Sequence, residues 1–374
     1  MSRRPRTVLA RVARPLARPV GGLLRRHPLV LPAVLFVLVL TLGLSNVGRP
    51  QTSGGRGSGA EAHAGLAGAQ TLPTQRGADP GGSGGSGSGG SADDDAAAGG
   101  TSSGVPTGGP GQLPRGGTTL FPRYRLVGYS GGPQSEAFGR LGIGDLDARV
   151  DEIERRATPY AAGREPLPVL ELIAVVVQAR PGADGKYRLR ADDAVVDGYL
   201  AAARRHRALL LLNIQPGRAD FLAEVKALER WLVQPDVGVA LDPEWAVGPR
   251  QVPGRVFGRT TGKELSRVAA YLQSLVREHR LPQKAMVVHQ LAPRIVTDFR
   301  SVGRHPDVAV ILSVDGIGAR ADKVATWRRL VAGLPPAVHP GFKLFFEEDA
   351  KSGALMTPLQ VLALRPQPEY VLYE

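Results

Sequence analysis

The sequence predicts an α/β protein: a (β/α)8 TIM barrel without its final helix, preceded by an N-terminal transmembrane helix and a disordered linker. Eight short apolar runs recur in residues 118–374, with helix-like stretches between them. The runs are nearly continuous, as in parallel strands covered on both faces. Their number and the length of this region match a (β/α)8 barrel. An open doubly wound sheet is the alternative, but eight evenly spaced units favour closure.

The first part of the chain is a basic head followed by an apolar span. Residues 1–27 are rich in arginine, and residues 28–47 contain no charged side chain. The span is long enough to cross a bilayer as a helix. Because the positive charges precede it, we expect a cytoplasmic head, a single pass through the cell membrane and an extracellular C-terminal domain. The alternative is a cleaved signal peptide, but the nearest small-x-small site, Ala62–Ala64, lies well downstream.

Residues 48–117 are expected to form a disordered linker between the span and the barrel. Residues 51–117 contain 22 glycines together with Ser, Ala, Pro and Thr, and no aromatic residue. Such a segment cannot bury enough apolar surface to offset the entropy of ordering it. It would hold the domain of residues 118–374 away from the bilayer.

The predicted strands and helices alternate along residues 118–374. Helical stretches show apolar residues at a spacing of three and four, and good capping residues precede two of them, Asp145 and Thr357. Seven helices are expected between the strands, among them 146–157, 194–205, 221–232, 265–279 and 324–331. The eight strands are expected at 124–129, 169–177, 208–214, 237–241, 285–289, 308–314, 342–346 and 370–373.

The strongest candidate site is the segment Asp242-Pro-Glu244-Trp245, which follows the fourth predicted strand. Active sites of these barrels lie at the carboxyl ends of the strands. Two carboxylates two residues apart project the same way from an extended chain. Sugar rings stack on indoles, so acid groups beside Trp245 suit a glycan. The alternative is structural: Asp242 caps a turn and Trp245 covers the rim.

Other strand ends also carry polar side chains. Glu347 and Glu348, after the seventh strand, complete the candidate catalytic set with Asp242 and Glu244. The candidates for substrate binding each have a structural alternative, such as a hydrogen bond to the backbone of a loop. The further candidates for substrate binding are Tyr129, Gln215, His289, Gln290, Asp315 and Asp349.

With carboxylates after the fourth and seventh predicted strands, the chain resembles retaining glycoside hydrolases of the barrel class. The resemblance implies that Glu244 is the acid/base and that Glu347 or Glu348 is the nucleophile. Asp242-Pro-Glu244 is also similar to the end of the chitinase-like DxxDxDxE pattern, although Val237 and Ala240 replace its first two aspartates. The LDPEW and VHQL segments are similar to those of uncharacterised anchored or secreted actinobacterial barrel proteins.

Composition narrows the function further. The chain has no cysteine, which excludes disulfides, thiolate metal sites and a cysteine nucleophile. The net charge of +13 is concentrated in the head, so we expect no nucleic-acid partner for the folded region. We also expect no cofactor. We expect a membrane-anchored glycoside hydrolase acting on cell-wall polysaccharide. The alternatives are a barrel that binds glycan without cleaving it, and a metal-assisted hydrolase or deacetylase built on Asp242, His289 and Asp315.

Overall fold

Eight parallel strands close into a barrel. The computed structural model describes residues 111–374; the expected head, membrane span and most of the linker lie outside them. β1 pairs with β2 on one side and with β11 on the other, which closes the sheet. The (β/α)8 prediction is therefore confirmed for the described residues. In order around the barrel the strands are β1 (Tyr124–Gly131), β2 (Glu165–Val177), β4 (Leu209–Ile214), β5 (Val237–Leu241), β7 (Lys284–Gln290), β9 (Val308–Val314), β10 (Val338–Leu344) and β11 (Tyr370–Tyr373).

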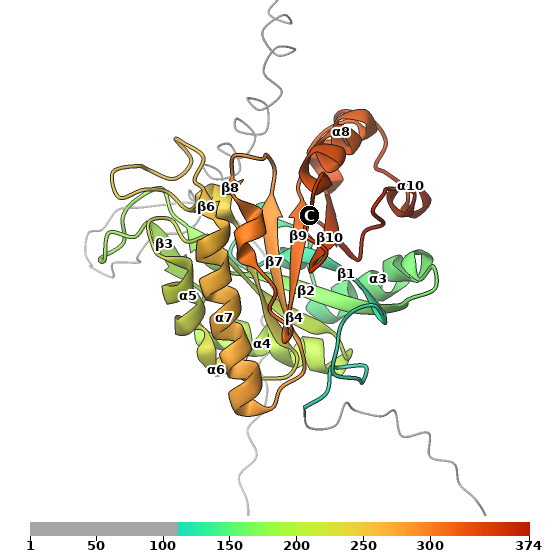
Figure 1. Ribbon diagram of the computed structural model, residues 1–374, viewed down its shortest axis with the longest axis horizontal. Helices are drawn as coiled ribbons and strands as arrows, with labels where there is room; N and C mark the ends of the chain where they lie inside the picture. Colours follow the sequence, from blue (N-terminus) through green and yellow to red (C-terminus); the bar gives the residue numbers. More distant parts are fainter. Residues whose placement is uncertain (1–110) are drawn as a thin grey trace, which may run out of the picture. The chain divides into compact units, whose positions relative to one another are not determined.

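Helices connect the strands and pack on the outside of the barrel, with α5 and α7 side by side (Figure 1). The predicted helix at 221–232 is divided at Leu228. No α-helix lies between β7 and β9 in the described chain; this connection holds β8 (Val296–Thr297), paired with β6 (Thr260–Thr261), and a short 3-10 helix. The expectation of a helix in every connection was wrong here, because Pro293, Gly303 and Pro306 interrupt the segment. The helices are α3 (Leu146–Ala157), α4 (Asp193–Arg205), α5 (Phe221–Ala227), α6 (Glu229–Leu232), α7 (Gly262–His279), α8 (Arg320–Val331), α9 (Phe346–Ala350) and α10 (Pro358–Leu362).

The seventh barrel strand ends earlier than the sequence predicts. β10 stops at Leu344, and the chain turns directly into α9, so Glu347 and Glu348 lie in the first turn of a helix. Phe345 and Phe346 extend the apolar run past the end of the strand, which is why the pattern placed the boundary two residues too late. β3 (Arg188–Arg190) adds a short antiparallel strand to β2.

The barrel interior begins with an apolar plug at the amino ends of the strands. Side chains of a strand alternate between its two faces, so inward positions are two residues apart. The buried interior cluster follows this spacing; it includes Tyr124, Leu126, Leu167, Val169, Leu209, Leu211, Ala285, Val287, Ala309, Ile311, Tyr370 and Leu372. A second, larger cluster lies between the strands and the helices.

The folded region begins before residue 118. Leu113 and Leu120 are fully buried in the interior cluster. Arg115 bonds Glu154 at 2.7 Å and the carbonyl of Pro166 at 3.2 Å. Residues 111–117, whose composition resembles the linker, therefore pack against the amino end of the barrel. Among the helices of residues 111–374, none combines the length and apolar character needed to cross a membrane.

Candidate active site at the carboxyl ends of the strands

A ring of polar side chains lies above the apolar plug. Counting two residues onward along the inward face of each strand leads from apolar to polar positions. In β2, for example, Leu167 and Val169 are followed by Glu171, and in β7 Val287 is followed by His289. Every barrel strand contributes at this level: Ser130, Glu171, Asn213, Asp242, His289, Ser313 with Asp315, Lys343 and Glu374.

His289 joins two buried carboxylates. Its Nδ1 lies 2.9 Å from Asp315 Oδ2 and its Nε2 lies 3.0 Å from Glu171 Oε1. Burial opposes its charge, but Asp315 and Glu171 together hold the pKa of His289 well above its usual range. Because both ring nitrogens face carboxylates, both act as donors and the ring is an imidazolium. In return, although burial acts the other way, His289 holds the pKa values of Glu171 and Asp315 below their usual range.

Tyr370 completes the environment of Glu171. Its hydroxyl donates a hydrogen bond of 2.5 Å to Glu171 Oε2. Gly341 makes room for this ring, because a Cβ at that position would lie 2.9 Å from it. A hydrogen-bonded ion network of this kind fixes its members in position.

Lys343 is the second cation of the ring. Its Nζ lies 2.8 Å from Glu374 Oε2 and 3.6 Å from Asp315 Oδ2. The Ser130 hydroxyl donates a 2.6 Å hydrogen bond to the same oxygen of Glu374. Burial would favour the neutral amine, but Glu374 and Asp315 keep the pKa of Lys343 well above its usual range. Lys343 is therefore charged at neutral pH.

Asp242 is held by two side-chain amides. Asn213 donates to its Oδ1 at 3.0 Å and Gln215 donates to its Oδ2 at 3.3 Å. Burial raises the pKa of Asp242 to about 6, with Glu171 adding to the effect and His289 and Lys343 opposing it. This carboxyl group therefore changes charge near the lower end of the physiological pH range.

Glu244 has a different environment. It sits in a short 3-10 helix, Pro243–Trp245, directly after Asp242, and is 5% exposed. Its Oε2 is buried without a hydrogen-bond partner among the described residues. Burial raises the pKa of Glu244 well above its usual range, and the nearby charges of Asp242 and Asp315 raise it further. The protonated form of Glu244 is therefore favoured.

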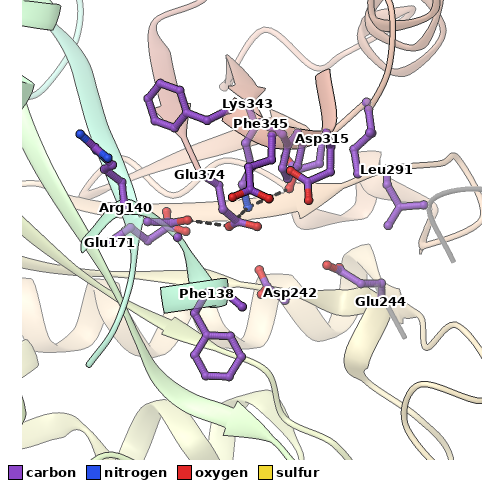
Figure 2. Close-up of a pocket in the computed structure, with 18 of the residues that line it drawn as sticks. Phe138, Arg140, Glu171, Asp242, Glu244, Leu291, Asp315, Lys343, Phe345 and Glu374 are labelled. Carbon is purple, nitrogen blue, oxygen red and sulfur yellow. Dashed lines mark hydrogen bonds and ion pairs between the residues drawn. The ribbon is translucent and has the colours of Figure 1, made fainter. Parts of the chain in front are cut away.

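The ring opens into a cavity of about 1350 Å³. Figure 2 shows the charged groups around this cavity together with apolar residues such as Phe138, Leu291 and Phe345. Trp245 and Phe257 also line it. The cavity exceeds the usual size of a small-molecule pocket, so it has room for more than one sugar ring.

The structure brings most of the predicted site residues to this cavity. Its lining includes Gln215, Asp242, Glu244, Trp245, Asp315, Glu347 and Glu348. Glu347 is exposed, whereas Glu348 is half-buried, and burial together with Glu374 and Glu347 raises the pKa of Glu348. His289 lies behind the cavity wall, where it contacts the lining residues Glu171 and Asp315.

Besides His289, three predicted residues do not line the cavity and make internal contacts instead. The Tyr129 hydroxyl donates to Glu152 and accepts from Arg156. The amide of Gln290 donates to loop carbonyls. Asp349 pairs with Lys323 at 2.9 Å and accepts backbone hydrogen bonds from Gly318 and from Phe345, which precedes α9.

The sequence reasoning missed six members of the ring: Ser130, Glu171, Asn213, Ser313, Lys343 and Glu374. A signal was present for two of them. Glu171 and Lys343 are charged residues inside otherwise apolar strand runs, where a charge requires buried partners. Their importance becomes visible once the inward face of each strand is known.

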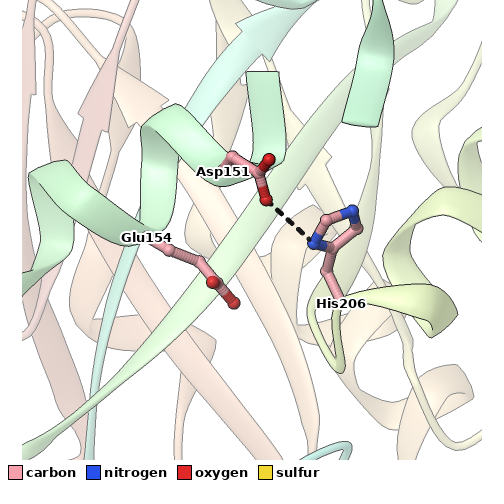
Figure 3. Close-up of side chains that lie close together, drawn as sticks. All are labelled: Asp151, Glu154 and His206. Atoms are coloured by element: carbon pink, nitrogen blue, oxygen red, sulfur yellow. Dashed lines mark ion pairs between the residues drawn. The ribbon is translucent and has the colours of Figure 1, made fainter. Parts of the chain in front are cut away.

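The structure argues against His289 as a metal ligand, because both ring nitrogens already face carboxylates. The grouping of potential ligands within residues 111–374 lies elsewhere, at Asp151, Glu154 and His206 (Figure 3). Glu154 is already paired with Arg115, and His206 with Asp147. This outer cluster is thus explained by local ion pairs.

Comparison with known proteins adds no assignment: neither a protein-family model nor a curated protein matches the chain.

Proposed function

We propose that the protein is a glycoside hydrolase that uses Glu244 as its general acid and acts on a cell-envelope glycan. The observation that carries the proposal is the environment of Glu244: its carboxyl group is buried, lines a large cavity, has a raised pKa and has one oxygen without a hydrogen-bond partner among residues 111–374. A general acid must hold its proton near neutral pH and release it to the leaving oxygen. Glu244 meets the first requirement through burial and neighbouring negative charge.

The cavity lining is compatible with a carbohydrate. Phe138, Trp245, Phe257 and Phe345 provide apolar surface for the C–H faces of sugar rings. Gln215 and the charged ring provide hydrogen-bonding groups for hydroxyls. This combination of apolar walls and a few fixed polar groups is typical of ligand sites.

The location is part of the same proposal and rests on the sequence. An anchor at residues 28–47 with an arginine-rich head would place the barrel outside the cell. The glycine-rich linker would then allow the barrel to reach polysaccharide near the membrane. This arrangement supplies the reason to choose an envelope glycan as the substrate.

The test uses the full chain in detergent with fractionated cell-wall polysaccharides, and measures release of reducing ends. Glu244→Gln keeps the shape of the neutral acid but removes its transferable proton. We expect turnover to fall by roughly 10²- to 10⁴-fold, the usual worth of general acid catalysis. Glu278→Gln, on the exposed surface of α7, is the matched control and should retain wild-type turnover.

Two outcomes would contradict the proposal. Full activity of the Glu244→Gln variant would show that Glu244 is structural. Binding of a glycan by wild-type protein with no turnover of any fraction would support the non-catalytic binding alternative.

A further inference from the structure

Most glycoside hydrolases use a second carboxyl group besides the acid. It must be an anion, and it needs an oxygen that is free to face the substrate. The carboxylates of the ring and those suggested by the sequence can be compared on these two requirements.

Glu171 and Asp315 fail the second requirement. Glu171 Oε1 faces His289 and Asn213, and its Oε2 accepts from Tyr370. Asp315 Oδ2 faces His289 and Lys343, and its Oδ1 accepts from Ser313. All four oxygens are therefore committed to the ring.

The carboxylates suggested by the sequence are also less suitable. Burial raises the pKa of Glu348, which favours its neutral form. Glu347 is exposed on α9 and has no ion-pair partner in the described chain. Asp242 has an amide donor on each of its two oxygens. None of the three combines a fixed anion with an unoccupied oxygen.

Glu374 combines both features. Its Oε2 is fixed by Lys343 at 2.8 Å and by Ser130 at 2.6 Å, so it is the anion of a partly buried ion pair. Within residues 111–374, no hydrogen bond to its Oε1 is formed. The side chain is 24% exposed and lines the cavity. One oxygen thus holds the group in place while the other remains available.

Glu374 also lies opposite Glu244. Glu244 follows β5, the fourth barrel strand, and Glu374 follows β11, the eighth. Fourth and eighth positions are diametrically opposed in a closed ring of eight. Figure 2 shows Glu374 and Lys343 on one side of the cavity and Asp242 and Glu244 on the other. A substrate between them would meet the acid on one face and the anion on the other.

We infer that Glu374 is the general base of the reaction, held in place by Lys343 and Ser130; this rests on the proposed glycoside hydrolase function. Glu374 accepts a proton from a water molecule whose oxygen bonds to the anomeric carbon. The bond from this carbon to the leaving oxygen breaks, and Glu244 protonates that oxygen. Proton exchange with solvent then restores both carboxyl groups. The opposed walls favour the wide separation of about 6.5–9.5 Å found in inverting enzymes.

The experiment uses the full chain in detergent with a panel of 4-nitrophenyl α- and β-glycosides and the cell-wall fractions. On each substrate that the wild type cleaves, we expect Glu374→Gln to lower turnover by roughly 10²- to 10⁴-fold. Glu154→Gln, which removes an arginine-paired carboxylate far from the cavity, should leave turnover unchanged. Chemical rescue distinguishes a catalytic role of Glu374 from a merely structural one. If Glu374 is the base, sodium azide should restore cleavage of a nitrophenyl glycoside by the Glu374→Ala variant. The wild-type product should first appear with inverted anomeric configuration by NMR.

Failure of the proposed function and failure of the role inferred for Glu374 would give different results. If the wild type cleaves no probe, the proposed function falls and the inference falls with it. If Glu244→Gln is impaired but Glu374→Gln retains at least half of the turnover, the function stands and the role of Glu374 is refuted. Loss of activity in Glu374→Ala without azide rescue, or retention of configuration, also overturns the assignment of Glu374 as the base.

Discussion

We expect the substitution Asp242→Asn to destabilise the protein at acid pH and to stabilise it at pH 8. The folded protein holds the pKa of Asp242 at about 6 against an ordinary value of 3.8, mainly through burial. The folded state therefore binds a proton more tightly than the unfolded state. The contribution of Asp242 to the free energy of unfolding falls as the pH rises above 3.8, and it levels off above about 6. The difference in pKa corresponds to about 3 kcal/mol over this range.

The substitution removes this pH-dependent loss but introduces a hydrogen-bond mismatch. Asp242 accepts from two amides, whereas an asparagine side chain can accept from only one of them. Gln215 cannot easily turn its amide to compensate, because its Oε1 accepts from the backbone N–H of Val177 at 3.2 Å. The buried mismatch should cost about 1–2 kcal/mol at every pH.

Together these terms predict curves that cross. Near pH 4 the Asp242→Asn variant should be less stable than wild type by about 1–2 kcal/mol, the cost of the mismatch. At pH 8 it should be more stable by about 1–2 kcal/mol, because wild type alone has lost its 3 kcal/mol.

The measurement is urea-induced unfolding of the full chain in detergent at pH 4, 6 and 8. Glu278→Gln serves as the control, because it changes an exposed carboxylate to an amide and should run parallel to wild type. Parallel curves for Asp242→Asn and wild type would refute the assigned role of burial in the chemistry of Asp242.

Two further predictions concern the amino end of the barrel and the location. Leu113→Ala should lower the free energy of unfolding by about 2–5 kcal/mol, because Leu113 is fully buried. Leu189→Ala, at a position 51% exposed, should cost less than about 0.5 kcal/mol; equal effects would mean that residues 111–117 do not belong to the folded region. If residues 28–47 anchor the chain as proposed, protease added to intact, wall-stripped cells should remove the barrel domain, and a protected domain would contradict the orientation.

The barrel could be predicted from the sequence because its strands carry a strong and simple signal. Parallel strands covered by helices are apolar on both faces, so eight runs stand out from their surroundings. Boundaries were harder to locate. At the end of β10 the apolar pair Phe345 and Phe346 continues the pattern after the chain has turned, so Glu347 and Glu348 were placed on a strand end instead of on α9.

The site was only partly predictable for a related reason. Asp242, Glu244 and Asp315 follow strands, and their polar character marks them directly. Glu171 and Lys343 lie within strands, where only their inward direction gives them a role. Their side chains point inward because they lie on the same strand face as the residues of the apolar plug. This shared face becomes recognisable when all eight strands are aligned.

The ring explains how one cavity can hold carboxyl groups in opposite states. Burial and the acidic neighbours Asp242 and Asp315 outweigh the opposing charge of His289 and raise the pKa of Glu244, which favours its protonated form. Glu374 lies against the ammonium of Lys343, so it is an anion. His289 forms ion pairs with Glu171 and Asp315. Lys343 is therefore available to pair with Glu374. Because Lys343 pairs with Glu374 while burial and acidic neighbours raise the pKa of Glu244, the environment favours a protonated carboxyl group on the wall of β5 and an anion on the wall of β11.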